Sequence, residues 1–317
     1  MKNILVTGSS GFIGSALVKL LYDKSDYAVY TLNRRFNIQL PETIHQIVSH
    51  SEQDIFSTEI PLHLDVIVHL AGRAHNLNDE SKHPLDEFRK ANVLGSIELA
   101  RQAIDKQVKR FIFISSIGVN GFLTTDKPFH EQDTPMPHAD YAISKLEAEE
   151  ALIELFKNTF TELVIIRPPL VYAAHAPGNF SRLLKIISTN FPLPFAFTHN
   201  KRSFIALENL VDFIECCILH QKAKNELFLI SDDENISTKQ LITHIQEGMG
   251  REAKFVYVPD FVLKVCATCL GKKKTYEQLF RSLEVDSSKA RDLLGWTPPI
   301  STVSALRKVG QTYNKLK

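Results

Sequence analysis

The stretch T-G-S-S-G-F-I-G, residues 7–14, decides the fold because a short apolar run precedes it and a helical pattern follows it. Its three glycines stand three residues apart. Glycines at such spacing permit a tight turn, let a pyrophosphate approach the backbone, and let the helix pack closely on the strand. The helix would also present free N–H groups and its positive dipole end to the phosphates. We therefore predict a dinucleotide-binding loop rather than a turn without a ligand. Its expected cofactor-binding residues are Gly8, Ser10, Gly11, Phe12, Ile13 and Gly14.

Outward from this loop, the first half of the chain alternates apolar runs with helical patterns. Strands are expected at residues 4–6, 29–32, 66–70, 111–114 and 163–166, and helices at 12–22, 86–106 and 141–157. Continuous apolar strands separated by helices indicate a parallel sheet covered on both faces. We therefore expect an α/β fold built on a doubly wound, Rossmann-type sheet.

The pattern changes after Pro169, where prolines cluster and the alternation becomes irregular. Two more strands are expected at residues 227–230 and 255–258, and the remainder is mostly helical. We predict a dinucleotide-binding domain at residues 1–172 and a smaller, mostly helical substrate-binding domain at residues 173–317. Segments near residues 203–215 and 226–231 are expected to return to the first domain.

Length and composition describe an ordinary globular protein. The 317 residues are 44% hydrophobic and 23% charged, and 37 Lys and Arg against 36 Asp and Glu give a net charge of +1. No global field therefore points to nucleic acid or to a membrane surface. No apolar run approaches the roughly 20 residues of a membrane span. The first apolar run stops before Thr7, too early for a secretory signal. We expect a cytoplasmic protein.

Two features near residue 265 allow alternatives. Cys266 and Cys269 form a C-x-x-C pair, but no second such pair and no paired histidines accompany it. Small buried hydrophobes are expected there, and no metal site. Residues 259–270 are largely apolar and precede three lysines, Lys272–Lys274. An interfacial helix has this pattern, and so has a packed helix with a solvated basic end. We expect the packed helix and no membrane contact.

The end of the second expected strand bears on the choice of cofactor. In dinucleotide-binding folds an acidic residue there holds the ribose 2′-OH of NAD, whereas an arginine accommodates the 2′-phosphate of NADP. Residues 29–35 read V-Y-T-L-N-R-R, so Asn33 takes the place of the acid and Arg34 and Arg35 follow. No carboxylate would repel a phosphate, and two guanidinium groups could pair with it. We therefore predict a preference for NADP(H), with NAD as the alternative.

A serine, a tyrosine and a lysine follow the expected strands in a suggestive order. Ser115 and Ser116 come directly after the strand at 111–114, at the sheet edge where α/β proteins bind ligands. Tyr141 and Lys145 are four residues apart and would share one face of the next helix. A tyrosine has a pKa of about 10 in solution, and a nearby ammonium group lowers this pKa by stabilising the phenolate. The tyrosine would then act as acid or base beside a hydride carrier, while a serine hydroxyl orients the substrate oxygen.

Several motifs occur in a fixed order along the chain. They are T-G-S-S-G-F-I-G at 7–14, H-L-A-G at 69–72, N-V-L-G at 92–95, S-S-I-G-V-N-G at 115–121, Y-A-I-S-K at 141–145, R-P-P-L-V-Y at 167–172, R-S-F-I-A-L-E-N-L-V-D at 202–212 and D-S-S-K-A-R-D-L-L-G-W at 286–296. Over nearly the whole length, the chain resembles the extended short-chain dehydrogenase/reductase family in its nucleotide-sugar epimerase/dehydratase branch.

The resemblance implies roles for individual residues. Tyr141 would be the proton donor, Lys145 its partner and a ligand of the nicotinamide ribose, and Ser116 the catalytic serine. Asn120 stands where the family pattern has a tyrosine, so this loop differs locally. Homodimers are common in the family. Further cofactor contacts are expected from Asp54, Leu70, Ala71, Gly72, Asn92 and Pro168. Substrate contacts are expected from Arg73, Ser115, Ser116, Asn179, Arg202 and Arg281, whereas His75 is expected to be an ordinary loop residue.

The resemblance also bears on the reaction. Dehydratases of this branch carry Thr-Asp-Glu where this chain has Ser-Ile-Gly at 116–118, which disfavours a 4,6-dehydratase. An epimerase removes a hydride from C4 of the sugar and returns it to the other face with a retained NAD, whereas a reductase delivers a hydride once and releases NADP. Asn33, Arg34 and Arg35 favour the reductase on electrostatic grounds. The resemblance of the motifs implies reduction of a UDP-4-keto-6-deoxy-N-acetylhexosamine for surface-polysaccharide (O-antigen) synthesis. A UDP-sugar 4-epimerase is the close alternative. A non-catalytic NADP(H)-binding sensor is a minor one, since both tyrosine and lysine are present.

Overall fold

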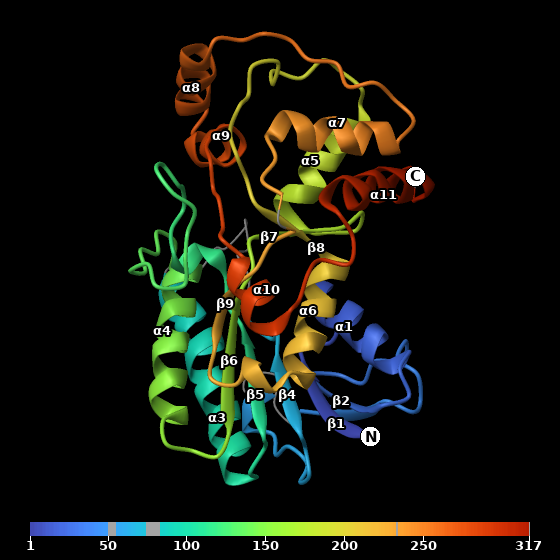
Figure 1. Ribbon diagram of the computed structural model, residues 1–317, viewed down its shortest axis with the longest axis vertical. Helices are drawn as coiled ribbons and strands as arrows, with labels where there is room; N and C mark the ends of the chain where they lie inside the picture. The colour runs from blue at the N-terminus through green and yellow to red at the C-terminus, as the bar shows by residue number, and fades with distance from the viewer. Residues whose placement is uncertain (50–54, 74–82, 233, 317) are drawn as a thin grey trace.

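A seven-stranded parallel sheet forms the frame of the lower half of the molecule (Figure 1). The computed structural model describes residues 1–49, 55–73, 83–232 and 234–316. In these residues the strand order is β3-β2-β1-β4-β5-β6-β9, and a separate parallel pair joins β7 to β8. The order reverses between β1 and β4, which is where doubly wound sheets open a ligand crevice at the carboxyl ends of their strands. The strands are β1 Lys2–Thr7, β2 Tyr27–Asn33, β3 His45–Val48, β4 Val66–His69, β5 Arg110–Ile114, β6 Glu162–Arg167, β7 Leu170–Tyr172, β8 Phe204–Ala206 and β9 Leu227–Leu229.

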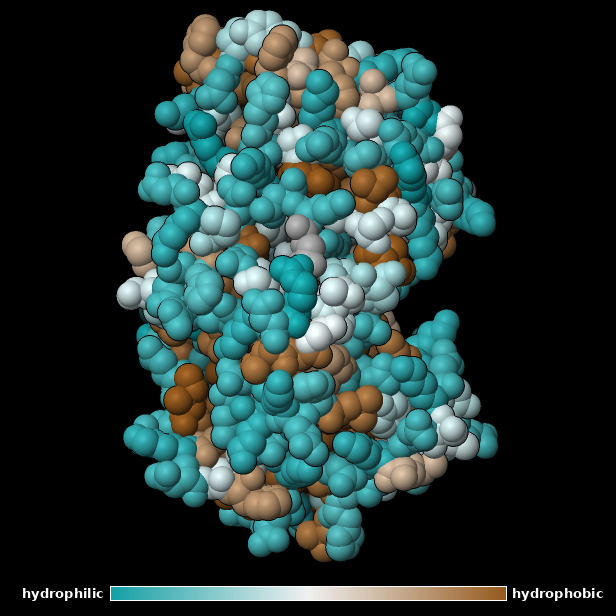
Figure 2. Space-filling view, viewed as in Figure 1, coloured by the Kyte–Doolittle hydropathy of each residue, from teal (hydrophilic) through white to brown (hydrophobic). Residues whose placement is uncertain are grey.

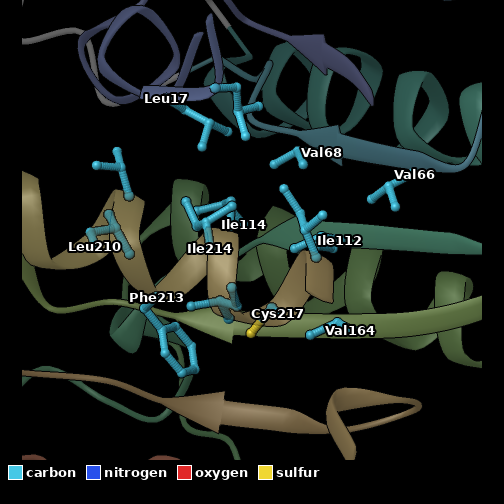
Figure 3. Packing of buried hydrophobic residues seen from close by; sticks show 14 of the residues in the cluster. Leu17, Val66, Val68, Ile112, Ile114, Val164, Leu210, Phe213, Ile214 and Cys217 are labelled. Carbon is cyan, nitrogen blue, oxygen red and sulfur yellow. The ribbon is translucent and has the colours of Figure 1, made fainter. Parts of the chain in front are cut away.

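Helices cover both faces of this sheet because successive strand side chains point to opposite faces. Ile4 and Val6 enter the core beneath α1 and α6, whereas Leu5 enters the core beneath α3 and α4. Figure 3 shows the first of these cores, where Leu210 and Ile214 of α6 face Ile114 of β5. The helices are α1 Phe12–Tyr22, α2 Pro84–Phe88, α3 Gly95–Asp105, α4 Asp140–Phe156, α5 Gly178–Ser188, α6 Leu207–Leu219, α7 Thr238–Gly248, α8 Asp260–Cys269, α9 Lys273–Phe280, α10 Ser288–Leu294 and α11 Thr302–Lys315. Shorter turns are η1 Ile55–Ser57, the π-helical η2 Arg89–Leu94, η3 Ile117–Val119 and η4 Gln221–Ala223.

The upper part of the molecule has its own apolar core. Side chains of β7, β8, α5, α7 and α11 form it. These elements lie together in the upper part of Figure 1. Helices α7 and α11 pack backbone to backbone at Gly248, which has no side chain. A Cβ atom there would lie 2.0 Å from the carbonyl oxygen of Arg307. Between the two cores, β9 pairs with β6 in the large sheet, so a late segment of the chain completes the lower sheet.

The structure confirms the α/β fold with a doubly wound sheet. Helix α1 has the predicted bounds, and the predicted helix at 86–106 is α2, η2 and α3 in direct succession. The predicted strand at 255–258 is wrong, because Phe255 makes only an isolated bridge to Leu193. Strands β3, β7 and β8 were not predicted. The domain boundary at residue 172 stays a prediction.

A second correction concerns helix α8. Cys266 and Cys269 are exposed rather than buried, and no residue of α8 is buried. The helix stands outside the upper core and contacts the start of α9 (Figure 1). In the described residues, no helix combines the length and the apolar character that a bilayer span needs.

Candidate active site

The glycine-rich loop between β1 and α1 forms a cradle at the carboxyl edge of the sheet. Gly8 has a φ of +69°, and a Cβ atom there would lie 2.7 Å from the backbone nitrogen of Ala71. On Gly14 a Cβ atom would lie 2.1 Å from the carbonyl oxygen of Gly8. Among the residues that the structure describes, no side chain caps the N-terminus of α1, and its first turn holds no acidic residue. Its free N–H groups at Phe12 and Ile13 therefore suit a pyrophosphate.

Asn33 ties the end of β2 to this cradle. Its buried side chain accepts a hydrogen bond from the Ser9 hydroxyl at 2.5 Å and donates one to Thr31 at 2.9 Å. Arg34 and Arg35 follow on the exposed surface, where a 2′-phosphate could reach them. Ser10 is also exposed on the loop. Asp54 and His75 lie outside the described residues.

The loop after β4 lies against the cradle and is held by Asn92. This buried side chain sits in the π-helical segment η2, a local widening that often marks functional sites. Its oxygen accepts from the Arg73 nitrogen at 2.7 Å, and its amide donates to the Arg73 carbonyl and to the Ser144 hydroxyl of α4. Asn92 therefore fixes the backbone of residues 70–73 relative to the helix that carries Tyr141.

A buried histidine, not singled out from the sequence, completes this support. His69 at the end of β4 joins Thr7 at 2.7 Å to Ser96 at 2.9 Å through its two ring nitrogens. The Ser96 hydroxyl donates to the carbonyl of Asn92, so it accepts from the histidine. Burial, and secondarily the charge of Lys145, lower the pKa of His69 to about 3. The neutral ring thus links the cradle to η2. The H-L-A-G motif was the only sequence signal for it.

The structure brings the three predicted catalytic residues to the carboxyl ends of β5 and β6. Ser116 is the N-cap residue of η3, and its hydroxyl accepts a hydrogen bond from the Gly118 nitrogen at 3.1 Å. Tyr141 lies in the first turn of α4, and Lys145 follows one turn later. A Cβ atom on Gly118 would lie 3.4 Å from the Ser116 hydroxyl and 3.3 Å from the Ala142 methyl, so the serine faces the start of α4.

The ammonium group of Lys145 contacts the backbone and an aromatic ring of β5. It donates to the Ile114 carbonyl at 2.8 Å and lies 4.3 Å from the centre of the Phe113 ring. Burial lowers the pKa of Lys145 to about 8, although the Glu149 carboxylate opposes this change. Burial raises the pKa of Tyr141 to about 12. Burial thus shifts the Tyr141 pKa in the direction opposite to the expected effect of Lys145, and the lowering by Lys145 stays a prediction.

The residues around the catalytic group fit a bound nicotinamide dinucleotide. The Ser115 hydroxyl is buried and, within the described part of the chain, lacks a hydrogen-bond partner. Lys145 uses one of its three N–H donors on Ile114, which leaves two for ribose hydroxyls. The carbonyl of Pro168 accepts from the Ile117 nitrogen and holds η3 against the end of β6. The glycine cradle and the free N-terminus of α1 would hold the pyrophosphate. Lys145 would hold the ribose.

A buried ion pair that the sequence did not predict supports the site from below. Arg167 at the end of β6 pairs with Glu149 of α4, and the two side chains are 4% and 1% exposed. The guanidinium group also donates to the Asn120 side chain at 2.8 Å, and Asn120 donates to the His130 carbonyl. Asn120, which replaces the tyrosine of the family pattern, therefore anchors the loop after Ser116.

The predicted substrate residues fall into two groups. Arg73 lies 5.7 Å from the Phe88 ring, and that ring packs at 6.1 Å from Tyr141, so Arg73 stands beside the catalytic end of α4. Arg202, whose pKa burial lowers to about 10, donates to the Arg281 carbonyl at 2.9 Å. Asn179 donates to Gln278 of α9.

A cavity of about 410 Å³ lies beside the second group. Arg281 lines it with Asp260, and its guanidinium group also contacts Tyr276 at 3.2 Å. The loop after η3, at residues 123–125, lines the same cavity, which connects it to the segment that carries Ser116. In the described residues, no three His, Cys, Asp or Glu side chains group as metal ligands.

Comparisons with known proteins agree with this site. The sequence profile described as the NAD dependent epimerase/dehydratase family matches residues 4–231. The chain is 39% identical to the UDP-glucose 4-epimerase of Vibrio cholerae, across 98% of this chain and 95% of that protein. It is 27% identical, over 81% of this chain and 75% of the other, to the N-acetyl-alpha-D-glucosaminyl-diphospho-ditrans,octacis-undecaprenol 4-epimerase of Escherichia coli O157:H7.

A solved structure extends the similarity to the fold. The UDP-glucose 4-epimerase of Thermotoga maritima, determined with UDP-glucose, superposes with a TM-score of 0.77 at 23% identity, covering 99% of this chain and all of that one. The resemblance to the extended short-chain dehydrogenase/reductases is thus confirmed. The chain belongs to the NAD dependent epimerase/dehydratase family, in its nucleotide-sugar branch.

Proposed function

We propose that the chain is an NAD-dependent UDP-sugar 4-epimerase. The observation that carries this proposal is the position of Ser116, Tyr141 and Lys145 at the carboxyl edge of the sheet, beside a glycine cradle suited to a pyrophosphate. The 39% identity to a UDP-glucose 4-epimerase over nearly the full length supports this reaction over the reductase that the motifs alone favoured.

The chain's own residues have separate tasks in this proposal. Bound NAD supplies the acceptor and donor of the C4 hydride. Tyr141 takes the proton of the sugar 4-hydroxyl and later returns it, and Ser116 donates a hydrogen bond to the same oxygen. Burial raises the pKa of Tyr141 to about 12, so its deprotonation near neutral pH needs positive charge close to the phenolate, and Lys145 is the residue proposed to supply it. Arg202 and Arg281 are proposed to bind the diphosphate of the substrate, since guanidinium groups pair bidentately with phosphate.

A 4-ketoreductase that uses NADPH is the second candidate, because one observation favours it. The end of β2 presents the neutral Asn33 and two exposed arginines, and such a site tolerates a 2′-phosphate. In the described residues, Arg34 makes neither a hydrogen bond nor an ion pair, so its charge is available. Preference for NADP(H) over NAD stays a prediction.

Two assays with purified protein separate the candidates. With NAD and UDP-glucose or UDP-N-acetylglucosamine, a 4-epimerase yields UDP-galactose or UDP-N-acetylgalactosamine, which chromatography detects. The nicotinamide absorbance shows no net change. With NADPH and a UDP-4-keto-6-deoxy-N-acetylhexosamine, a reductase consumes NADPH stoichiometrically. Epimerised sugar in the first assay supports our proposal, and NADPH loss in the second without epimerisation replaces it with the reductase.

The variant Tyr141→Phe tests the catalytic assignment in whichever assay is active. We expect turnover to fall by about a hundredfold to ten-thousandfold, because general acid–base catalysis contributes roughly 10²–10⁴. Cofactor binding, followed by fluorescence titration, should not change. Near-normal turnover would show that another group moves the proton.

A further inference from the structure

Helix α8 presents an apolar face to the solvent. Phe261, Val265 and Cys269 stand four residues apart and therefore lie above one another on one side of the helix. The side chains of Phe261 and Val265 are 69% and 58% exposed. The ring of Tyr257, which is also exposed, packs edge-on against Phe197 at 5.0 Å. We call the set Phe197, Tyr257, Phe261, Val265, Cys269 and Leu270 the α8 face. Figure 2 shows apolar residues at the upper end of the molecule, where Figure 1 draws α8.

Positive charge surrounds this face. Between residues 254 and 274 the chain carries five lysines and one acidic residue, although the whole chain has a net charge of only +1. The acidic residue, Asp260, accepts a hydrogen bond from Tyr276 at 2.5 Å and lies 3.6 Å from Arg281. In the described part of the chain, Lys264 and Lys272–Lys274 are exposed and make no ion pair. The local charge is therefore positive and uncompensated.

We propose that the α8 face docks on an anionic phospholipid bilayer surface. Helices that lie in the membrane interface combine aromatic and aliphatic side chains on one face with flanking lysines. Anionic lipid headgroups attract each lysine near the surface. A second copy of the chain is a poorer occupant, since two α8 faces in contact would bring their lysine clusters together, and like charges repel. The charge of this face thus selects a negatively charged partner.

The position of the face gives the docking a consequence for the active site. Phe197, a member of the α8 face, and Asp260, the first residue of α8, line the cavity beside Arg281. Docking would therefore bring this wall of the cavity near the lipid headgroups. The strands of the lower sheet extend away from α8 toward the other end of the molecule and would remain in solution (Figure 1).

Vesicle sedimentation tests the proposal on the full-length protein. Vesicles of phosphatidylglycerol and phosphatidylcholine in equal parts should carry the protein into the pellet, and vesicles of phosphatidylcholine alone should not. Binding should be lost at about 1 M salt, where the Debye length falls to about 3 Å. No sedimentation with the anionic vesicles would overturn the proposal, as would equal sedimentation with both kinds.

Variants on the face sharpen the test. We expect Phe261→Ser with Val265→Ser to weaken binding by about tenfold or more. Changing Lys272, Lys273 and Lys274 to Gln should weaken binding by about a hundredfold. The matched control is Phe160→Ser, since Phe160 is 71% exposed at a distant turn and should bind vesicles like the unchanged protein. All three variants should keep their melting temperature.

Two outcomes with these variants would contradict the proposal. The first is unchanged vesicle binding after the Phe261 and Val265 substitutions, because the apolar face would then have no part in docking. The second is a dimer in sedimentation equilibrium that dissociates on the same substitutions, because the face would then be an interface between copies of the chain. Neither outcome depends on the epimerase activity.

Discussion

Substitution of Glu149 by Gln should destabilise the protein strongly and also lower the pKa of the neighbouring Lys145. Glu149 is 1% exposed and compensates the charge of Arg167, which is 4% exposed. Removing one partner of a buried pair leaves an uncompensated charge and costs about 3–5 kcal/mol. For 317 residues, an unfolding entropy of about 2.1 cal/mol/K per residue converts this loss into a melting temperature lower by about 5–8 °C.

The same carboxylate affects Lys145, which lies one helical turn before it. Burial lowers the pKa of Lys145 to about 8, and Glu149 raises that pKa. Without the carboxylate the pKa should move further down, so the ammonium loses its proton at a lower pH. If activity requires the charged lysine, the alkaline limb of the kcat/KM profile moves toward lower pH in Glu149→Gln.

A second buried pair provides the matched control. Arg110 and Glu162 form an ion pair at 2.6 Å, and their side chains are 5% and 14% exposed. They begin β5 and β6, at the end of the strands away from Arg167. Arg110 also donates to the carbonyls of Cys217 and His220, so Glu162→Gln should cost less, about 1.5–3 kcal/mol. Urea denaturation measures both losses. A loss below about 1 kcal/mol for Glu149→Gln, or the same alkaline limb in both variants, would refute the reasoning.

Three further substitutions test the cofactor cradle and its support. In Gly14→Ala the new Cβ atom would lie 2.1 Å from the Gly8 carbonyl, so dinucleotide affinity measured by fluorescence titration should fall by at least about tenfold. In Asn33→Asp the new carboxylate should repel a 2′-phosphate, so calorimetry should give an NADPH affinity lower by about tenfold or more and an NADH affinity that is unchanged or higher; equal losses would mean that residue 33 is remote from the 2′ position. His69 has a pKa of about 3 when folded and 6.5 when unfolded, so the unfolded state binds its proton first as the pH falls. This group should therefore reduce stability from about pH 6.5 downward, by up to about 1.4 kcal/mol per pH unit, and His69→Gln should give a shallower slope in urea denaturation at acidic pH.

The parts of the site that could be predicted from the sequence are those with a local signature. The glycine spacing at residues 7–14 and the four-residue step from Tyr141 to Lys145 each describe geometry within a single loop or helical turn, and the structure has that local geometry in both places. Strands buried on both faces likewise have a continuous apolar signature, which is why β1, β4, β5 and β6 were predicted.

What the sequence could not predict depends on contacts between distant segments. Arg167 meets Asn120 across 47 residues of chain, and His69 reaches Thr7 across 62. The hydrogen bond from Lys145 to the Ile114 carbonyl likewise joins residues 31 positions apart, and the spacing along α4 does not predict it. Residues 255–258 alternate aromatic side chains with β-branched valines, as a strand would, but among the described residues they find no neighbouring strand beyond one bridge. The cysteines of α8 were expected inside because their neighbours are apolar, yet the helix lies on the surface.

The catalytic helix and the substrate-binding segment differ in how firmly they are packed, and this difference favours the epimerase. The catalytic frame is rigid, because buried bonds from Asn92, Lys145 and Arg167 hold α4 and its neighbours together. The helices beside Arg281 are packed more loosely, because α8 holds no buried residue and α9 holds only the buried Tyr276. Segments with few buried contacts open at low free energy. A reductase needs its sugar in one orientation, whereas an epimerase must let the 4-keto sugar turn between two hydride transfers while its proton donor stays fixed. A fixed catalytic helix below an adaptable substrate segment meets both requirements of the epimerase.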